Sequence, residues 1–178
     1  MKKVTVMTAV MALAAGTALA QLPGADALKQ KAAGAGGAAY LAARTAFNKA
    51  VKDIPFAYNS AELNLDDPKY TVAGVNVGEF MKKTVIPALV KAVELAPADK
   101  QVTVTGHASR RGTEEPSGSF QGNTALSKAR AEAVVKYIMA NSDLPESRFK
   151  VVAAGSSAPL AGTDPAADKN CRVSLELQ

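Results

Sequence analysis

The chain is poor in the residues that support several common kinds of protein chemistry. Among its 178 residues it has one cysteine, Cys171, and one histidine, His107. A single cysteine cannot form an internal disulfide, although exported proteins often contain paired cysteines. With no second histidine and no cysteine near His107, the usual ligands of a zinc site are missing. We therefore expect no metal site and no cofactor.

Long hydrophobic runs are also scarce, and the one that is present lies at the N-terminus. Residues 1–20 begin with two lysines, continue with an apolar run and end in Ala18-Leu19-Ala20. This pattern is typical of a secretory signal peptide that is cleaved before Gln21. The run is shorter than the roughly 20 apolar residues of a spanning helix, and no cysteine follows the cleavage site to carry a lipid anchor. We expect an exported mature chain without a transmembrane segment.

The sequence also has no large excess of basic over acidic residues or of acidic over basic residues. The sequence has 21 Lys and Arg residues and 16 Asp and Glu residues. Removal of Lys2 and Lys3 with the signal peptide leaves 19 basic and 16 acidic residues, a net charge of +3. Proteins that bind nucleic acid concentrate basic residues in a stripe or patch. A net charge this small predicts no nucleic-acid partner.

The mature chain divides by composition into a leader and one domain. Residues 21–53 are rich in Ala and Gly, and residues 54–178 have the mixed composition of a folded domain. Residues 21–37 are interpreted as flexible. Between Ala38 and Lys52 the apolar Tyr40, Phe47 and Val51 fall on one face, which predicts a short amphipathic helix. Its apolar face would pack on the domain or on a partner.

Strand and helix patterns alternate through the domain. Apolar alternation predicts strands over residues 54–60, 101–105, 149–154 and 172–177, and helical periodicity predicts helices over residues 79–96 and 125–141. Pro87 interrupts the first of these helices, so a kink or a restart is expected there. The order β-α-β-α-β-β predicts the α/β class, an α+β two-layer sandwich with both helices on one face of a small mixed sheet.

Arg130 lies where local preference argues against a cation. It falls four residues after Leu126 and four before Val134, so it shares their core-facing stripe. A positive charge near the start of a helix opposes the helix dipole at a cost of roughly 0.3–1 kcal/mol, and a buried arginine needs an anionic partner. A bound carboxylate would provide that partner. The structural alternative is a salt bridge to Glu114, Glu115 or Asp164.

Short motifs around Arg130 carry a resemblance to a known family. The sequence contains Gly106-His107 after a strand, Asn123 and then Leu126-Ser127-x-x-Arg130-Ala131 in a helix, and Asn170-x-Arg172-Val173 before the last strand. Over about residues 54–177 these motifs resemble the OmpA-like domain, which binds peptidoglycan without a covalent bond. The resemblance implies that Arg130 binds the carboxylate of the diaminopimelate residue in the wall peptide. It also implies a ligand groove near His107, Ser109, Asn123, Asn170 and Arg172.

The chain departs from the family pattern at one ligand-binding position. The family has Gly-His-Thr-Asp, whereas this chain has Gly106-His107-Ala108-Ser109. In the family the aspartate binds the ligand's ammonium, and loss of such a charged partner costs ~1.5–3 kcal/mol. Glu114 or Glu115 in the following loop could replace that carboxylate, and the alternative is a solvated acidic pair. Cys171 also replaces an arginine of the family pattern.

Four of these residues have alternative interpretations. His107 lies near Ser109 and two glutamates, but no nucleophile-elbow motif is present, so we expect no hydrolase and no other enzyme. Cys171 shares strand parity with Val173 and is expected in the core, the alternative being an intermolecular disulfide. Asn123 is expected to cap the second helix, and Arg172 could equally be a surface residue.

The sequence as a whole predicts a periplasmic protein that binds peptidoglycan through its OmpA-like domain. Because the mature chain has no predicted anchor of its own, association with the outer membrane would require a protein partner. The helix at residues 38–52 is the candidate docking surface. The alternative is an OmpA-like fold that has lost wall binding and serves as a periplasmic protein-interaction module.

Overall fold

The structure is a computed structural model that describes residues 25–178, with side chains from Gly36 onward. The predicted signal peptide, residues 1–20, lies outside the described residues. The chain divides into two units after Ala38, and residues 39–178 form one of them. Among the described residues, no helix combines the length and the apolar character that a membrane crossing requires.

Helix α1 spans Ala25–Ala50 and is longer than predicted. The interpretation of residues 21–37 as flexible is wrong from residue 25 onward. Alanine, leucine and lysine are among the best helix formers, and together they outweigh the roughly 1 kcal/mol that each glycine costs. In the second unit, the apolar face of α1 is buried through Tyr40 and Phe47, with Val51 just beyond the helix.

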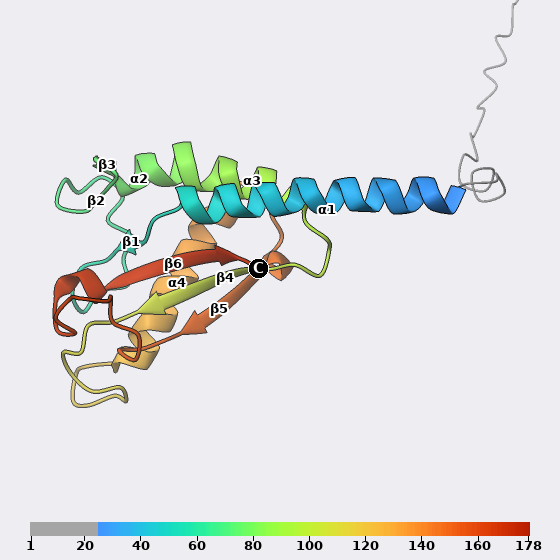
Figure 1. The fold of residues 1–178 in the computed structure, drawn as a ribbon. Helices are drawn as coiled ribbons and strands as arrows, with labels where there is room; N and C mark the ends of the chain where they lie inside the picture. Colours follow the sequence, from blue (N-terminus) through green and yellow to red (C-terminus); the bar gives the residue numbers. More distant parts are fainter. Residues whose placement is uncertain (1–24) are drawn as a thin grey trace, which may run out of the picture. The chain divides into compact units, whose positions relative to one another are not determined.

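Four strands form a mixed sheet in the order β1-β6-β4-β5. Strands β4 (Val102–His107) and β5 (Phe149–Ala153) run parallel, and β6 (Arg172–Leu177) is antiparallel to both β4 and β1. Figure 1 shows β6, β4 and β5 side by side with helix α4 behind them. The predicted α/β class and small mixed sheet are confirmed.

Strand β1 (Ile54–Pro55) is much shorter than the predicted strand over residues 54–60. After Pro55 the chain turns, and the carbonyls of Ala57 and Ser60 accept hydrogen bonds from Arg130 instead of pairing with a strand. A hairpin of β2 (Thr71–Val72) and β3 (Val75–Asn76) lies in a region for which no strand was predicted. Its turn residues Ala73 and Gly74 have φ values of 52° and 85°, as the favoured tight hairpin turn requires.

The helices follow the predicted order with one irregularity. Helix α2 (Val77–Phe80) continues through a π-helical stretch, Met81–Val85, into α3 (Ile86–Leu95). Pro87 lies in the first turn of α3, where its missing N–H costs little. In place of the predicted kink or restart, the chain stays helical, and a π-helical stretch ends directly before Ile86 and Pro87. Helix α4 spans Asn123–Ala140.

Helix α4 packs very closely on β4. A Cβ atom at Gly106 would lie 1.8 Å from the carbonyl oxygen of Ser127, a separation that no side chain tolerates. This approach places the start of α4 beside the end of β4, where Ser109 follows. Cys171, just before β6, is buried as a free thiol, which confirms its predicted core position.

Candidate ligand-binding site

Arg130 of α4 is fully buried, at 0% exposed, and is held by three backbone carbonyls. Its Nε donates to Ser60 O at 2.8 Å, its Nη1 to His107 O at 2.7 Å and its Nη2 to Ala57 O at 2.8 Å. Among the described residues, no carboxylate pairs with it. The predicted salt bridge to Glu114, Glu115 or Asp164 is therefore wrong, because carbonyl dipoles take the place of the anion.

The buried positive charge of Arg130 affects the electrostatic potential of the surface above it. Burial lowers the pKa of Arg130 from its usual value, but a guanidinium stays protonated at neutral pH. The guanidinium carbon lies 5.7 Å from the centroid of the Phe56 ring, within cation–π range. A positive charge without a neighbouring carboxylate thus lies beneath the turn formed by residues 57–60. Such a charge attracts anions to this part of the surface.

Ser109 occupies the position at which the family pattern has aspartate, and it is buried. The backbone N–H of the preceding Ala108 donates to Gly155 O at 2.7 Å. Ser109 Oγ accepts a hydrogen bond of 3.2 Å from Arg111 Nε. The Ser109 hydroxyl is therefore covered by the guanidinium of Arg111, which lies two residues further along the chain.

Arg111 joins two other surface residues in what we call the Arg111 cluster: Tyr58, Arg111 and Asp168. The guanidinium carbon of Arg111 lies 3.9 Å from the centroid of the Tyr58 ring, and Nη2 forms an ion pair with Asp168 Oδ1. The Arg111 side chain is 37% exposed and the Asp168 side chain 76% exposed. The sequence reasoning missed all three residues. The available signal was the pair Arg110-Arg111 directly after Ser109.

Glu114 has a structural role that differs from the predicted one. Its carboxylate accepts from the backbone N–H of Ser156 at 3.2 Å and from the Ser156 hydroxyl, and it lies 3.3 Å from Thr124 Oγ1. These contacts tie the loop after β5 to the start of α4. The interpretation of Glu114 as a replacement for the family's aspartate is not supported by this geometry, and Glu115 is exposed.

Asn123 does not cap α4, so that prediction is wrong. Gly122 occupies the N-cap position and no side chain bonds there. The carbonyls of Thr113 and Glu114 accept instead from the N–H groups of Asn123 and Thr124, at 2.9 and 3.2 Å. The loop that follows Arg111 therefore satisfies the helix start with its own backbone. Asn123 is buried behind that loop.

Asn170 precedes β6 and Arg172 is its first residue, and the two side chains have different partners. Asn170 is fully buried and bonds Leu160 N–H at 2.8 Å and Asp164 O at 2.9 Å, so it shapes the loop that precedes Asp168. Arg172 is also buried, and its Nε donates to Asp53 Oδ2 at 2.7 Å. The alternative of a surface position for Arg172 is therefore wrong.

The ring of His107 faces away from Arg130, although its backbone carbonyl holds that residue. Successive side chains of a strand point to opposite faces, and Gly106 faces α4. The ring Nε2 lies 3.2 Å from Ser174 Oγ, and Nδ1 is buried without a partner. Burial, with a smaller effect of Arg172, lowers the pKa of His107 to about 4. The ring is therefore uncharged at neutral pH, and its partner is Ser174, not Ser109.

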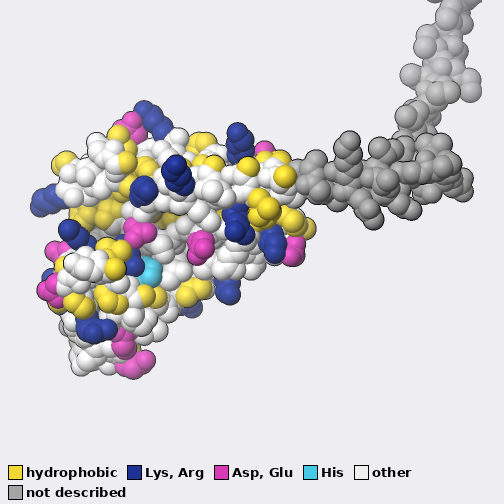
Figure 2. Space-filling model, viewed as in Figure 1, with side chains coloured by type: hydrophobic (Ala, Val, Ile, Leu, Met, Phe, Trp, Pro, Cys, Tyr) yellow, Lys and Arg dark blue, Asp and Glu magenta, His cyan; other side chains and the backbone are white. Residues whose placement is uncertain are grey.

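The structure thus brings Arg130 and Ser109 together with the Arg111 cluster, and Asn123 and Asn170 support the surrounding loops. It separates the His107 ring and Arg172 from them. Basic and acidic side chains are interspersed over the face shown in Figure 2, without a broad patch of one sign. Among the described residues, no group of three His, Cys, Asp or Glu is placed to hold a metal ion.

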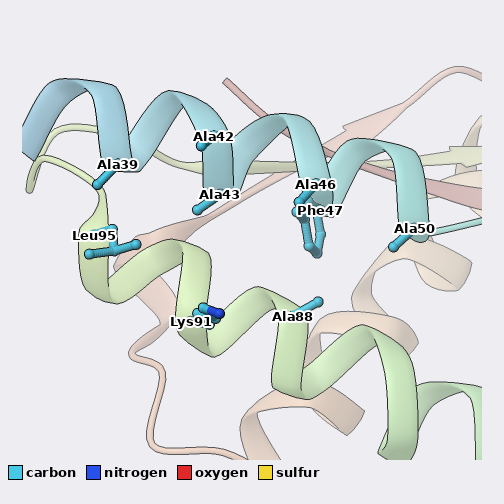
Figure 3. A pocket seen from close by; sticks show the side chains of 9 residues that line it. All are labelled: Ala39, Ala42, Ala43, Ala46, Phe47, Ala50, Ala88, Lys91 and Leu95. Atoms are coloured by element: carbon cyan, nitrogen blue, oxygen red, sulfur yellow. The ribbon is translucent and has the colours of Figure 1, made fainter.

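A cavity of about 400 Å³ lies between α1 and α3 and contains none of the predicted site residues. Figure 3 shows its lining, which consists of small and apolar side chains apart from Lys91. With only one polar side chain at its wall, this cavity lacks the convergent polar groups of a ligand site. The surface around Ser109 and the Arg111 cluster, where the family resemblance implies a ligand groove, remains the candidate site.

The model of the OmpA family matches residues 79–172 of this chain. The chain belongs to the OmpA family. The predicted resemblance is confirmed by this match, which includes Ser109 and Arg130 and covers more than half of the chain.

Two of the similar solved structures, those of the lipoprotein and of MotB named below, share the fold of this chain. The peptidoglycan-associated lipoprotein from Burkholderia pseudomallei is 21% identical, with 72% of this chain and 92% of that chain covered and a TM-score of 0.51. The C-terminal domain of Helicobacter pylori MotB is 18% identical, with 72% and 86% covered and a TM-score of 0.52. The OmpA-like domain of FopA1 from Francisella tularensis subsp. tularensis SCHU S4 is 27% identical, with 71% and 72% covered and a TM-score of 0.48. No curated protein sequence matches the chain.

Proposed function

We propose that this protein is an exported, non-enzymatic component of a bacterial cell envelope that associates with peptidoglycan without a covalent bond. Membership of the OmpA family supports the proposal, as does the name of a structural relative, the peptidoglycan-associated lipoprotein. The observation that carries it is Arg130. This arginine occupies the family's ligand-binding position and has no carboxylate partner among the described residues.

The ligand in this proposal is the carboxylate of diaminopimelate in the wall peptide. Arg130 provides the positive charge at the floor of the groove, below the turn formed by residues 57–60. A charge in a partly dehydrated site acts on a ligand more strongly than it would in water. No catalysis is proposed, because the ring of the single histidine faces the opposite side of the sheet and bonds Ser174.

The proposed location is the periplasm, reached through the signal peptide of residues 1–20. Attachment to the outer membrane would come from a protein partner, for which the helix at residues 38–52 is the proposed docking surface. The second candidate function is a periplasmic protein-interaction module that no longer binds wall. Two observations favour it: Ser109 stands in place of the family's aspartate, and Arg130 is closed off from solvent.

Co-sedimentation with purified, protein-free peptidoglycan tests the proposal. The mature chain should pellet with the wall, and an Arg130→Met variant that remains folded should not. Arg148→Met is the matched control, because Arg148 also bonds backbone carbonyls, at Val93, Pro97 and Ala98, but lies away from the groove. This control should pellet like the parent.

A second measurement covers the case in which Arg130→Met does not fold. Soluble wall peptides that contain diaminopimelate should release the parent protein from the pellet, whereas wall peptides with lysine at that position should do so less. If the parent fails to pellet at all, wall association is wrong and the interaction-module function takes its place.

A further inference from the structure

We propose that Arg111, rather than Arg130, contacts the bound carboxylate, and that it makes the groove prefer a carboxylate whose neighbouring amine is absent or acylated. In a wall peptide an acylated amine marks a cross-linked diaminopimelate. The inference rests on the proposed function, since it concerns the ligand of the same groove.

Accessibility separates the two arginines. Arg130 is 0% exposed, and Nε, Nη1 and Nη2 each donate to a backbone carbonyl. Direct contact with a ligand would require the turn of residues 57–60 to open. The Arg111 side chain is 37% exposed and bonds Ser109 Oγ, beside the implied ligand groove. A carboxylate that approaches from solvent can therefore bond Arg111 without any change in the fold.

Arg111 already holds a carboxylate, that of Asp168. The Asp168 side chain is 76% exposed, and ion pairs at such exposure contribute little to stability. A ligand carboxylate can therefore replace Asp168 on Nη2. The guanidinium is meanwhile kept in place by the Tyr58 ring at 3.9 Å and by Ser109 Oγ at 3.2 Å. A binding group held in this way loses less conformational entropy when the ligand arrives.

The replacement at Ser109 accounts for the preference against an ammonium. In the family pattern an aspartate at this position accepts the ligand's ammonium. Here Arg111 Nε bonds Ser109 Oγ, so a positive charge lies where the family has a negative one. A ligand ammonium at this place would meet a like charge, which disfavours binding. An acylated amine carries no charge and avoids the conflict.

Two dicarboxylates of equal chain length test the inference. Pimelate and meso-diaminopimelate differ only in the two ammonium groups, and both can be titrated into isotope-labelled mature protein while NMR shifts of groove residues are recorded. The parent should bind pimelate about tenfold or more tightly than meso-diaminopimelate, the ratio expected for one charged contact. Arg111→Gln should abolish the preference, and Ser109→Asp combined with Arg111→Gln should reverse it.

Arg110→Gln is the matched control, because it removes the same charge from an exposed neighbouring residue and should leave the preference intact. The inference is overturned if meso-diaminopimelate binds as tightly as pimelate, if Arg111→Gln leaves the ratio unchanged, or if neither compound shifts a groove resonance. Pelleting with intact wall is measured separately. A parent that pellets without showing this preference would retain the proposed function and lose only the inference.

Discussion

The side-chain amide of Asn48 on α1 hydrogen-bonds both backbone groups of Leu177 at the end of β6. Its Oδ1 accepts from the Leu177 N–H at 3.0 Å, and its Nδ2 donates to the Leu177 carbonyl at 3.1 Å. Strand β1 pairs only with Arg172 and Val173 of β6. Beyond them, Asn48 pairs with the strand edge much as another strand would. The helix thus protects an edge that could otherwise pair with another chain.

Asn48→Ala should lower the free energy of unfolding by about 1–2 kcal/mol, because two backbone groups lose their partner. It should also increase aggregation on heating, since the β6 edge becomes available. Urea unfolding and light scattering measure the two effects. Lys49→Ala on the same helix is the control and should change little. Equal stability of the two variants would contradict the role of Asn48.

Gly106→Ala should separate α4 from β4, since its Cβ would lie 1.8 Å from Ser127 O. The added methyl group would meet the backbone of Ser127, which cannot move aside as a side chain can. The overpacking should therefore lower the free energy of unfolding by ~3 kcal/mol or more. Gly37→Ala in α1 is the control, as nothing lies within 4 Å of its Cβ. The control should be neutral or slightly stabilising. A Gly106→Ala protein with parental melting temperature would show that the helix can move away freely.

Arg130→Met should destabilise the fold by about 3 kcal/mol, because it leaves the carbonyls of Ala57, Ser60 and His107 without their donor. Arg130→Lys keeps the charge, but its one nitrogen cannot reach three separate carbonyls as a guanidinium does. It should therefore recover only part of the lost stability. Urea unfolding at neutral pH gives the comparison. A Lys variant as stable as the parent would mean that charge matters here and the three-carbonyl geometry does not.

The neutral ring of His107 should make stability fall in mild acid. Its folded pKa is about 4, below the unfolded value of about 6.5. Between these values the unfolded chain binds a proton that the folded chain does not, so stability declines as the pH falls from 6.5 to 4 and the decline from this group ends below 4. The full shift corresponds to roughly 3 kcal/mol. His107→Gln should show a flatter curve over this window, and parallel curves would contradict the lowered pKa.

Much of the local structure follows from the sequence, because it is set by short-range patterns. Strands β5 and β6 lie within a residue of their predicted bounds, and α4 begins two residues early. The irregularity of the helix before Pro87 follows from the missing N–H of one residue. The predicted strand over residues 54–60 was too long, since a distant arginine takes up the carbonyls there.

The site was predicted only in part. The stripe of α4 and the family motif both single out Arg130, and the missing acid at Ser109 is visible in the sequence. The parity of β4 could also have shown that His107 and Gly106 face opposite sides. Asn123 was assigned the wrong role, because the competing loop carbonyls of Thr113 and Glu114 come from a segment without a recognisable pattern.

The sequence by itself determined the family, the order of elements and the buried position of Arg130, since each depends on residues close together in the chain. Only the tertiary structure decided which carbonyls hold that arginine and which residues form the Arg111 cluster. Tyr58, Arg111 and Asp168 come from three loops that meet because the sheet brings the chain segments after β1, β4 and β5 to one end. Contacts between such distant residues leave no periodic trace in a sequence, because they depend on how the strands are ordered in space.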